Sequence, residues 1–252
     1  MIKDFYDKHK NFSCRKLTEY YISPGIKCKF DLLKANLNTK KTYNYGIDLG
    51  SSGNSFLFFL DNINQKFSLD IADLPLKQYI NKNKWHPICG DLLKLPYRDE
   101  IFDFISVLDV IEHLKEDENA ISEMSRILKK KGILIITVPH RMKYYTAQDY
   151  LIGHYRRYEI KQIIHSFKRY NLRNLKTFGI YGQLMIISDL QSTNPKKLEE
   201  SLITLREKYE SNIGFRVLWD LIVKFFSKLM KLDAKYNSIY KIRNIGLVFI
   251  KK

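Results

Sequence analysis

The chain has 252 residues and a formal net charge of +16, and 45% of its residues are hydrophobic. This length and composition suit one large α/β domain and exclude a disordered or low-complexity chain. The charge favours acidic partners, namely nucleic acid, anionic lipid or phosphorylated substrates, although a solvated basic surface without a dedicated ligand gives the same balance.

Cysteine usage and hydropathy favour a reducing, cytoplasmic location. Cys14, Cys28 and Cys89 are scattered, which is not the spacing of a disulfide framework or of a zinc site, so no metal is expected. The polar sequence after Met1 is unlike a signal peptide. No apolar run reaches the roughly 18 residues that a membrane-spanning helix needs.

The centre of the chain alternates strand-like and helix-like segments. Short apolar runs predict strands at residues 45–49, 66–70, 85–89, 102–108, 133–138, 172–180 and 246–250. Helices are expected to start at 55–61 and near Pro75, and to cover 118–130, with Gly132 as its cap, and 159–170.

This alternation predicts an α/β fold with a Rossmann-like, seven-stranded, mostly parallel sheet and helices on both faces. The last strand is expected to be antiparallel at the far side of the sixth. We expect an N-terminal cap at 1–41, a core at 42–182, a basic helical insertion at 183–243 and the last core strand at 244–252.

The loop after the first strand has the form of a nucleotide-binding turn, Asp48-Leu49-Gly50-Ser51-Ser52-Gly53-Asn54. No lysine follows Gly53, which excludes a P-loop, and the glycines are too few for a dinucleotide fingerprint. Asp48 would repel a pyrophosphate. It would favour S-adenosylmethionine, which carries an amino group and a sulfonium and has no phosphate.

Residues 45–54 resemble the first motif of class I S-adenosylmethionine-dependent methyltransferases, which usually contains Asp-x-Gly-x-Gly-x-Gly. Ser52 replaces the second glycine and Asn54 the last, while Gly53 occupies a spacer position. A tight turn in an α/β protein that binds no nucleotide would explain this loop if it stood alone.

Three further segments extend the resemblance over residues 42–182, with an echo at 246–252. Asp70, followed by Ile71, ends the second strand, where an acid can accept both ribose hydroxyls. Gly90-Asp91-Leu92 resembles the third motif, in which the acid accepts from the adenine amino group and the next amide donates to the ring.

The runs 102–114 and 123–132 resemble the fourth strand with its exit and the helix that follows. The resemblance implies that Leu108 and Asp109 line the pocket beside the methyl donor. The predicted cofactor-binding residues are therefore Asp48, Gly50, Ser51, Ser52, Gly53, Asp70, Ile71, Asp91, Leu92, Leu108 and Asp109.

Three histidines are candidate catalytic residues. Methyl transfer is an in-line displacement that depends on positioning, but a hydroxyl acceptor also needs a general base. His113 follows the fourth strand and His140 the fifth, at the edge where ligands bind in open sheets. His154 lies in the segment 153–158. For His113, a structural role at a helix start is the alternative.

The segment 153–158 resembles a Gly-His-x-Arg-Arg-Tyr segment in a methyltransferase subgroup linked to cell-surface sugar and lipid biosynthesis. Arg156 and Arg157 could hold a phosphate or carboxylate of the acceptor. We count Tyr144, His154 and Tyr158 with them as candidate substrate-binding residues. Capping and solvating a loop would explain the two arginines equally well.

A segment within the basic insertion predicts an amphipathic helix. Its apolar residues recur at helical spacing, with mainly basic residues on the other side: Phe215, Leu218, Trp219, Ile222, Phe225, Phe226, Leu229 and Met230. Such a helix either rests on anionic lipid and brings the active site to a lipid-linked acceptor, or packs on the sheet or on a partner subunit.

The sequence therefore predicts an S-adenosylmethionine-dependent methyltransferase that acts on a small-molecule or lipid- or sugar-linked acceptor. It is expected in the cytoplasm, with contact to the inner face of an anionic membrane left open. An RNA-directed methyltransferase and a non-catalytic adaptor with the same fold are the alternatives. An RNA-directed enzyme would lose affinity steeply with salt.

Overall fold

The computed structural model describes residues 15–38, 40–184 and 195–252, with side chains described from residue 200 in the last range. A single seven-stranded sheet has the order β3-β2-β1-β4-β5-β7-β6. All seven predicted strands are confirmed, with these bounds: β1 Tyr43–Leu49, β2 Ile63–Asp70, β3 Trp85–Cys89, β4 Phe102–Leu108, β5 Leu128–Pro139, β6 Leu172–Tyr181 and β7 Asn244–Lys251.

The sheet is parallel from β3 to β5, and β7 runs antiparallel to both of its neighbours. The prediction that the last strand lies beyond the sixth is wrong, because β7 lies between β5 and β6. Its residues from Asn244 to Phe249 are buried. Burial explains this position, because a strand that pairs with a neighbour on each side leaves no backbone edge exposed.

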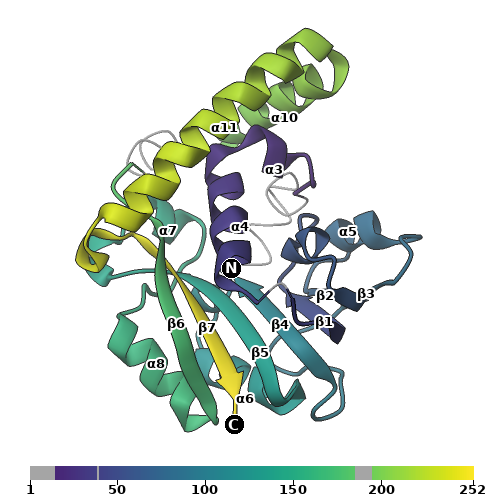
Figure 1. Cartoon of the computed structure of the whole chain (residues 1–252), viewed down its shortest axis with the longest axis vertical. Helices are drawn as coiled ribbons and strands as arrows, with labels where there is room; N and C mark the ends of the chain where they lie inside the picture. The colour runs from purple at the N-terminus through teal and green to yellow at the C-terminus, as the bar shows by residue number, and fades with distance from the viewer. Residues whose placement is uncertain (1–14, 39, 185–194) are drawn as a thin grey trace.

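Helices cover both faces of the sheet (Figure 1). On one face α6 (Asp117–Ile127) and α8 (Ile160–Arg169) bury Met124, Ile163 and Phe167 against the strands. On the other face α4 (Pro24–Asn36) and a single 3-10 turn, η1 (Phe56–Phe59), bury a second apolar cluster that includes Phe30 and Phe56. The core thus consists of two apolar layers with the sheet between them.

Two helix predictions need correction. The expected helix start at 55–61 is only the turn η1, because β2 already begins at Ile63 and leaves no room for a longer helix. Gly132 does not cap α6, which ends at Ile127. The chain is extended from Leu128, which pairs with Phe102, and the left-handed turn residue is Lys131 with φ 60°.

The remaining short elements connect these layers. They are α3 (Glu19–Ile22), α5 (Asp73–Leu76), η2 (Lys77–Tyr79), η3 (Ile111–His113), η4 (Met142–Tyr144), α7 (Ala147–Leu151) and η5 (Ile239–Lys241). The helix expected near Pro75 is α5, and it begins two residues earlier.

A helical arm lies between β6 and β7 in the sequence. It consists of α10 (Pro195–Ser211) and α11 (Ile213–Tyr236), and the predicted amphipathic helix lies within α11. The arm is joined to the N-terminal helices by a buried ion pair between Arg206 and Glu19, by the Trp219 indole N–H donating to the Ile22 carbonyl at 3.0 Å, and by a Lys231–Asp31 ion pair at 2.9 Å.

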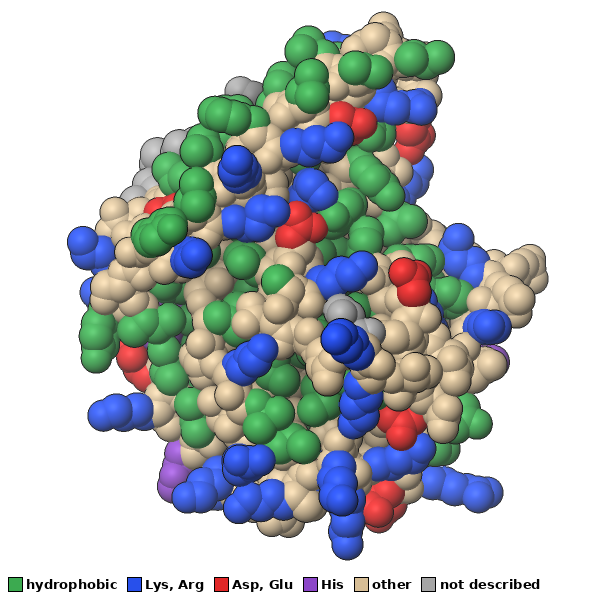
Figure 2. All heavy atoms as spheres, in the orientation of Figure 1, with side chains coloured by type: hydrophobic (Ala, Val, Ile, Leu, Met, Phe, Trp, Pro, Cys, Tyr) green, Lys and Arg blue, Asp and Glu red, His purple; other side chains and the backbone are tan. Residues whose placement is uncertain are grey.

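The arm lies at the end of the sheet where open α/β sheets generally bind their ligands. Because β7 points away from α4 and runs antiparallel to β5, the carboxyl ends of the parallel strands face α4 and, beyond it, α11 (Figure 1). Figure 2 shows hydrophobic and basic side chains side by side along α11. Among the described helices, none is long and apolar enough to cross a membrane.

Candidate functional site

The loop between β1 and η1 is fixed by the backbone of β2. The amides of Gly50 and Ser51 donate to the Leu69 carbonyl at 2.8 and 3.3 Å. Gly50 has φ 71°, and a Cβ there would lie 2.5 Å from a methyl of Val110. A glycine is therefore required at this position both by conformation and by space.

Asp48 holds the base of this loop from inside. Its carboxylate is buried and accepts from the Ser55 hydroxyl at 2.6 Å, the Phe56 amide at 3.2 Å and the Ser106 hydroxyl at 2.6 Å. Burial raises its pKa to about 6, against the effect of these hydrogen bonds. The carboxylate thus ties the loop to η1 and β4, and this accounts for an acid at the end of β1 whether or not the group also faces the cofactor.

Asp70, at the end of β2, contacts the same loop with its side chain. Its carboxylate accepts from the Ser52 amide at 2.9 Å and the Ala72 amide at 3.0 Å. Burial raises the pKa of Asp70. Ser52, which stands where the family motif has glycine, adopts the left-handed conformation with φ 45°. The serine therefore keeps the turn that glycine normally makes, at some cost in strain.

Gly53 is covered by the N-terminal part of the chain. A Cβ on Gly53 would lie 1.9 Å from the Arg15 carbonyl oxygen and 2.1 Å from the Gln78 amide nitrogen. Gln78 donates to that carbonyl at 2.8 Å, and the Arg15 amide donates to the Ser52 hydroxyl at 3.3 Å. Gly53, which occupies a spacer position of the sequence motif, is thus the point where the segment around Arg15 packs directly on the loop.

The other predicted cofactor residues lie at the neighbouring strand ends. Asp91 follows β3 and is exposed, and its carboxylate accepts from the Leu93 amide at 2.9 Å, while Leu92 is buried. Ile71 is 54% exposed. Leu108 is half-buried in the apolar layer beside α4. Asp48, Asp70 and Asp91 therefore follow or end β1, β2 and β3 in turn, at one edge of the sheet.

Asp109 is the centre of a polar cluster after β4. It pairs with Lys29 of α4 at 2.8 Å and accepts from Thr137 at 2.9 Å and Asn244 at 2.8 Å. Burial by itself would raise the pKa of Asp109, but Lys29 and the hydrogen bonds lower it to about 2. Lys29 and Asn244 had no place in the sequence prediction, because they come from opposite ends of the chain.

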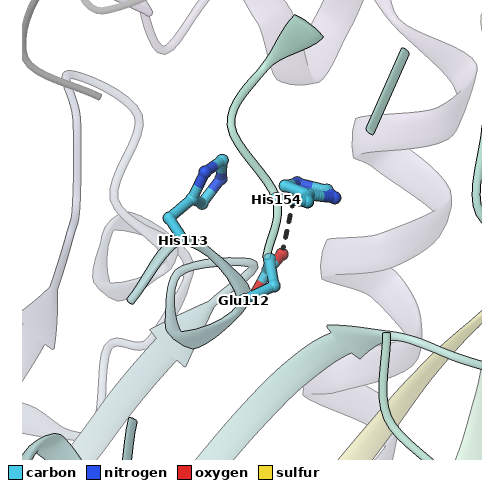
Figure 3. Close-up of side chains that lie close together, drawn as sticks. All are labelled: Glu112, His113 and His154. Atoms are coloured by element: carbon cyan, nitrogen blue, oxygen red, sulfur yellow. Dashed lines mark ion pairs between the residues drawn. The ribbon is translucent and has the colours of Figure 1, made fainter. Parts of the chain in front are cut away.

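Glu112, His113 and His154 gather next to this cluster (Figure 3). The rings of His113 and His154 lie 4.5 Å apart, edge to face. Burial, and next the charge of Asp109, raises the pKa of Glu112 well above its usual value. Burial and the neighbouring His154 lower the pKa of His113 to about 4. Two of the three predicted catalytic histidines thus come together.

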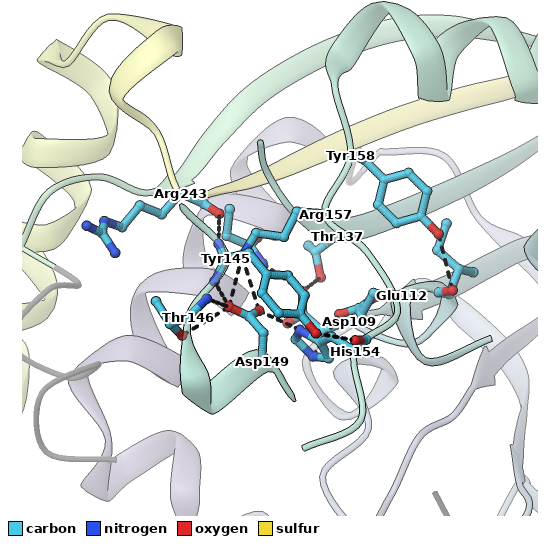
Figure 4. A network of polar contacts seen from close by, with 12 residues as sticks. Asp109, Glu112, Thr137, Tyr145, Thr146, Asp149, His154, Arg157, Tyr158 and Arg243 are labelled. Atoms are coloured by element: carbon cyan, nitrogen blue, oxygen red, sulfur yellow. Dashed lines mark hydrogen bonds and ion pairs between the residues drawn. The ribbon is translucent and has the colours of Figure 1, made fainter. Parts of the chain in front are cut away.

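Asp149 orients His154 (Figure 4). The imidazole Nδ1 lies 2.7 Å from one carboxylate oxygen, which only accepts, so Nδ1 carries the proton. Thr146 and Arg157 also donate to Asp149. Although burial opposes it, these groups hold the pKa of Asp149 well below its usual range. Its Thr-x-x-Asp capping box was a sequence signal that the prediction did not use.

The arginines of the segment 153–158 are engaged in ion pairs. Arg157 binds Asp149 at 2.7 Å, and Arg156 binds Asp117 at 2.9 Å. The buried Tyr158 donates to Asp117 at 2.8 Å. In this structure these residues brace the loops after β4 and β5, and acceptor binding by Arg156, Arg157 and Tyr158 stays a prediction.

The remaining two candidates lie elsewhere along the same edge. His140 is 2% exposed, and its Nδ1 lies 3.0 Å from the Ile242 carbonyl oxygen. The Tyr144 hydroxyl donates to the Tyr240 carbonyl at 3.1 Å, and Arg243 stacks on the Tyr144 ring. His140 is thus held by the segment just before β7, apart from the cluster of Glu112, His113 and His154.

Comparison with known proteins shows what the domain and the fold are similar to. Residues 47–136 match the methyltransferase domain family. A phosphoethanolamine N-methyltransferase 2 of Haemonchus contortus, in complex with S-adenosyl-L-methionine, has a TM-score of 0.63 at 17% identity, covering 100% of this chain and 60% of that one. The N-methyltransferase NodS of Bradyrhizobium japonicum, with bound S-adenosylhomocysteine, has a TM-score of 0.58 at 16% identity, covering 71% and 91%.

Residues 47–136 thus match a methyltransferase domain, and the whole chain has the fold of these S-adenosylmethionine-dependent methyltransferases. An uncharacterized protein of Methanocaldococcus jannaschii is 32% identical over 145 residues, which cover 56% of this chain. The chain spans less than two thirds of the length of the curated relatives that it matches, and 61% of this archaeal one.

Substitution of Gly53 tests whether the N-terminal part of the chain packs tightly on the loop after β1. Gly53→Ala is expected to destabilise the protein by about 1–3 kcal/mol, because the new methyl forces Arg15 and Gln78 away. Trypsin should then cleave faster at Arg15 and Lys16. Gly214→Ala is the control, since its Cβ would meet only Asn212 at 3.5 Å. Unfolding and cleavage like those of the wild type would contradict the tight packing.

Proposed function

We propose that this protein binds S-adenosylmethionine on the loops after β1, β2 and β3, and transfers its methyl group to a lipid-linked acceptor at the surface of an anionic membrane. The observation that carries the membrane part is the exposed apolar row on α11. The acceptor side is the cluster of Asp109, Glu112, His113 and His154 at the same sheet edge.

The hydrogen-bond acceptors of these loops fit S-adenosylmethionine. Asp70, Asp91 and Asn54 offer acceptor oxygens, and the Oδ1 of Asn54 is buried with no hydrogen bond from the described residues. Such acceptors suit a ligand with an amino group, a positive sulfonium and two ribose hydroxyls. Asp70 uses part of its four acceptor positions on backbone amides, which leaves positions for the ribose hydroxyls.

Bound S-adenosylmethionine would supply a methyl group that its sulfonium already activates. The protein then has to position the acceptor atom in line with the bond between sulfur and methyl. The chain's own residues would bind and orient both partners. Gly50 lets the backbone approach the cofactor, Asp70 would hold the ribose, and Asp91 with the Leu92 amide would hold the adenine. Lys29 keeps Asp109 ionised, and this carboxylate would lie beside the methyl donor.

The outer side of α11 suits a lipid surface. One row of apolar side chains, 37–74% exposed, runs along it at helical spacing: Leu218, Leu221, Phe225, Leu229, Leu232 and Tyr236. A second row, at the same kind of spacing, is basic: Lys224, Lys228 and Lys235 are exposed, while Lys231 in the same row is half-buried and pairs with Asp31. The opposite side, with Val223 and Ala234, is buried on the protein.

The two rows lie side by side in the space-filling view (Figure 2). The apolar row favours the acyl boundary of a bilayer, and the adjacent lysines favour anionic headgroups, which attract each basic residue by about 1 kcal/mol. A core-packed helix would bury the apolar row instead. Since α11 packs on α4, which supplies Lys29 to Asp109, the membrane surface and the acceptor cluster belong to one connected structure.

Vesicle binding tests the membrane surface. We expect the protein to sediment with phosphatidylcholine vesicles that contain phosphatidylglycerol, and not with phosphatidylcholine alone. The double variant Leu221→Glu/Phe225→Glu should bind at least tenfold more weakly, because burying each of these side chains is worth about 2 kcal/mol. Leu175→Glu, at an exposed position of β6, is the control. Equal binding of both variants, or no binding at low salt, would contradict the surface.

Methyl transfer itself is tested with radiolabelled S-adenosylmethionine and a cellular lipid extract presented in the same anionic vesicles. Label is expected in the chloroform-soluble fraction, and the Leu221→Glu/Phe225→Glu variant should transfer much less to lipid while keeping its affinity for the cofactor. Label that enters RNA from a total RNA sample, and not lipid, would overturn the proposed acceptor class in favour of an RNA-directed enzyme.

A further inference from the structure

The buried carboxylate of Glu112 stands out in the acceptor cluster. Glu112 is 0% exposed, and neither of its oxygens accepts a hydrogen bond from any described residue. A buried carboxylate is strongly disfavoured unless a proton, an ion pair or a metal ion compensates it. The turn η3, between β4 and α6, holds the residue in this position.

His154 faces that carboxylate with its other ring nitrogen. Nδ1 donates to Asp149 at 2.7 Å, so the Nε2 of a neutral ring would carry a lone pair, and this atom lies 3.8 Å from the Glu112 Oε1. Two acceptors that face each other at this distance repel unless a proton or cation lies between them. Figure 3 shows the His113 ring beside the same gap.

We propose that Glu112, His113 and His154 bind a divalent transition-metal ion of the zinc type. One ligand atom from each residue lies within 4.8 Å of the other two. Ligands at about 2.0–2.2 Å from such an ion lie roughly 3–4 Å apart, so the three side chains close in by about 1 Å on binding. Two imidazoles and one carboxylate form a donor set that suits zinc and its neighbours.

Asp149 and Arg157 complete the site from behind. A metal-binding histidine commonly donates its second nitrogen to a carboxylate, which fixes the ring and makes the free nitrogen a better ligand. Asp149 does this for His154, and Arg157 and Thr146 hold Asp149 in turn. His154 is therefore oriented as a ligand before any ion binds.

Three protein ligands leave one position open. It would hold a water molecule, or an oxygen or nitrogen of the acceptor beside Asp109, and this second role rests on the proposed methyl transfer. Metal binding itself does not, because it is measured without cofactor or acceptor. The sequence analysis expected no metal because the cysteines are scattered. The spacing of residues could not reveal a site whose ligands come from two separate loops.

Metal titration tests the site. The tag-free full chain, stripped with a chelator, is titrated with Zn²⁺ by calorimetry and with Co²⁺ by visible absorption. We expect one ion per chain and the intense d–d bands of a four-coordinate cobalt site. Glu112→Gln, which keeps the shape of the side chain, and His154→Gln should each lower the affinity at least tenfold. His165→Gln, an exposed histidine on α8, is the control and should bind as the wild type does.

Circular dichroism of each variant shows whether the fold is kept. If Glu112→Gln does not fold, His154→Gln still decides the question. Absence of stoichiometric binding to the wild type, or equal binding by the folded Glu112→Gln and His154→Gln variants, would overturn the proposal. A protonated Glu112, seen as a carbonyl stretch that the Gln variant removes while zinc is present, would overturn it as well.

Discussion

The buried carboxylate of Asp48 makes the interactions on which the proposed cofactor-binding loop depends. It joins the end of β1 to η1 through Ser55 and Phe56, and to β4 through Ser106. With this base fixed, the amides of Gly50 and Ser51 can bond to β2, and Ser52 can reach Asp70. A charge without these donors would be costly at this depth, so the acid and its hydroxyl partners are needed together.

A second acid, the half-buried Asp109, has the same role on the proposed acceptor side. Lys29, Thr137 and Asn244 bring α4, β5 and β7 to it. Because β7 lies antiparallel between β5 and β6, its first residue, Asn244, reaches Asp109. The packing of α11 on α4 connects the exposed apolar row of α11 with Lys29. The site, the sheet topology and the proposed membrane surface therefore depend on one another through a few half-buried polar contacts.

Local pattern was sufficient to predict the seven strands, because each is a short apolar run bounded by turn residues. It also placed Asp48, Asp70 and Asp91 at one sheet edge, since parallel strands end on the same side. The local sequence pattern could not place β7 in the sheet, because its neighbours depend on long-range pairing. It could not place Lys29 beside Asp109 for the same reason. It gave Glu112 no role, because burial of that acid against His154 arises only when the loops after β4 and β5 meet.

Calorimetric titration of the wild-type chain with S-adenosylmethionine and S-adenosylhomocysteine tests the central claim most directly. The account predicts one binding site for each ligand, and at least a tenfold loss of affinity in Asp70→Ala, with the exposed Asp61→Ala unchanged. Absence of binding by the folded wild-type chain at millimolar ligand would contradict it.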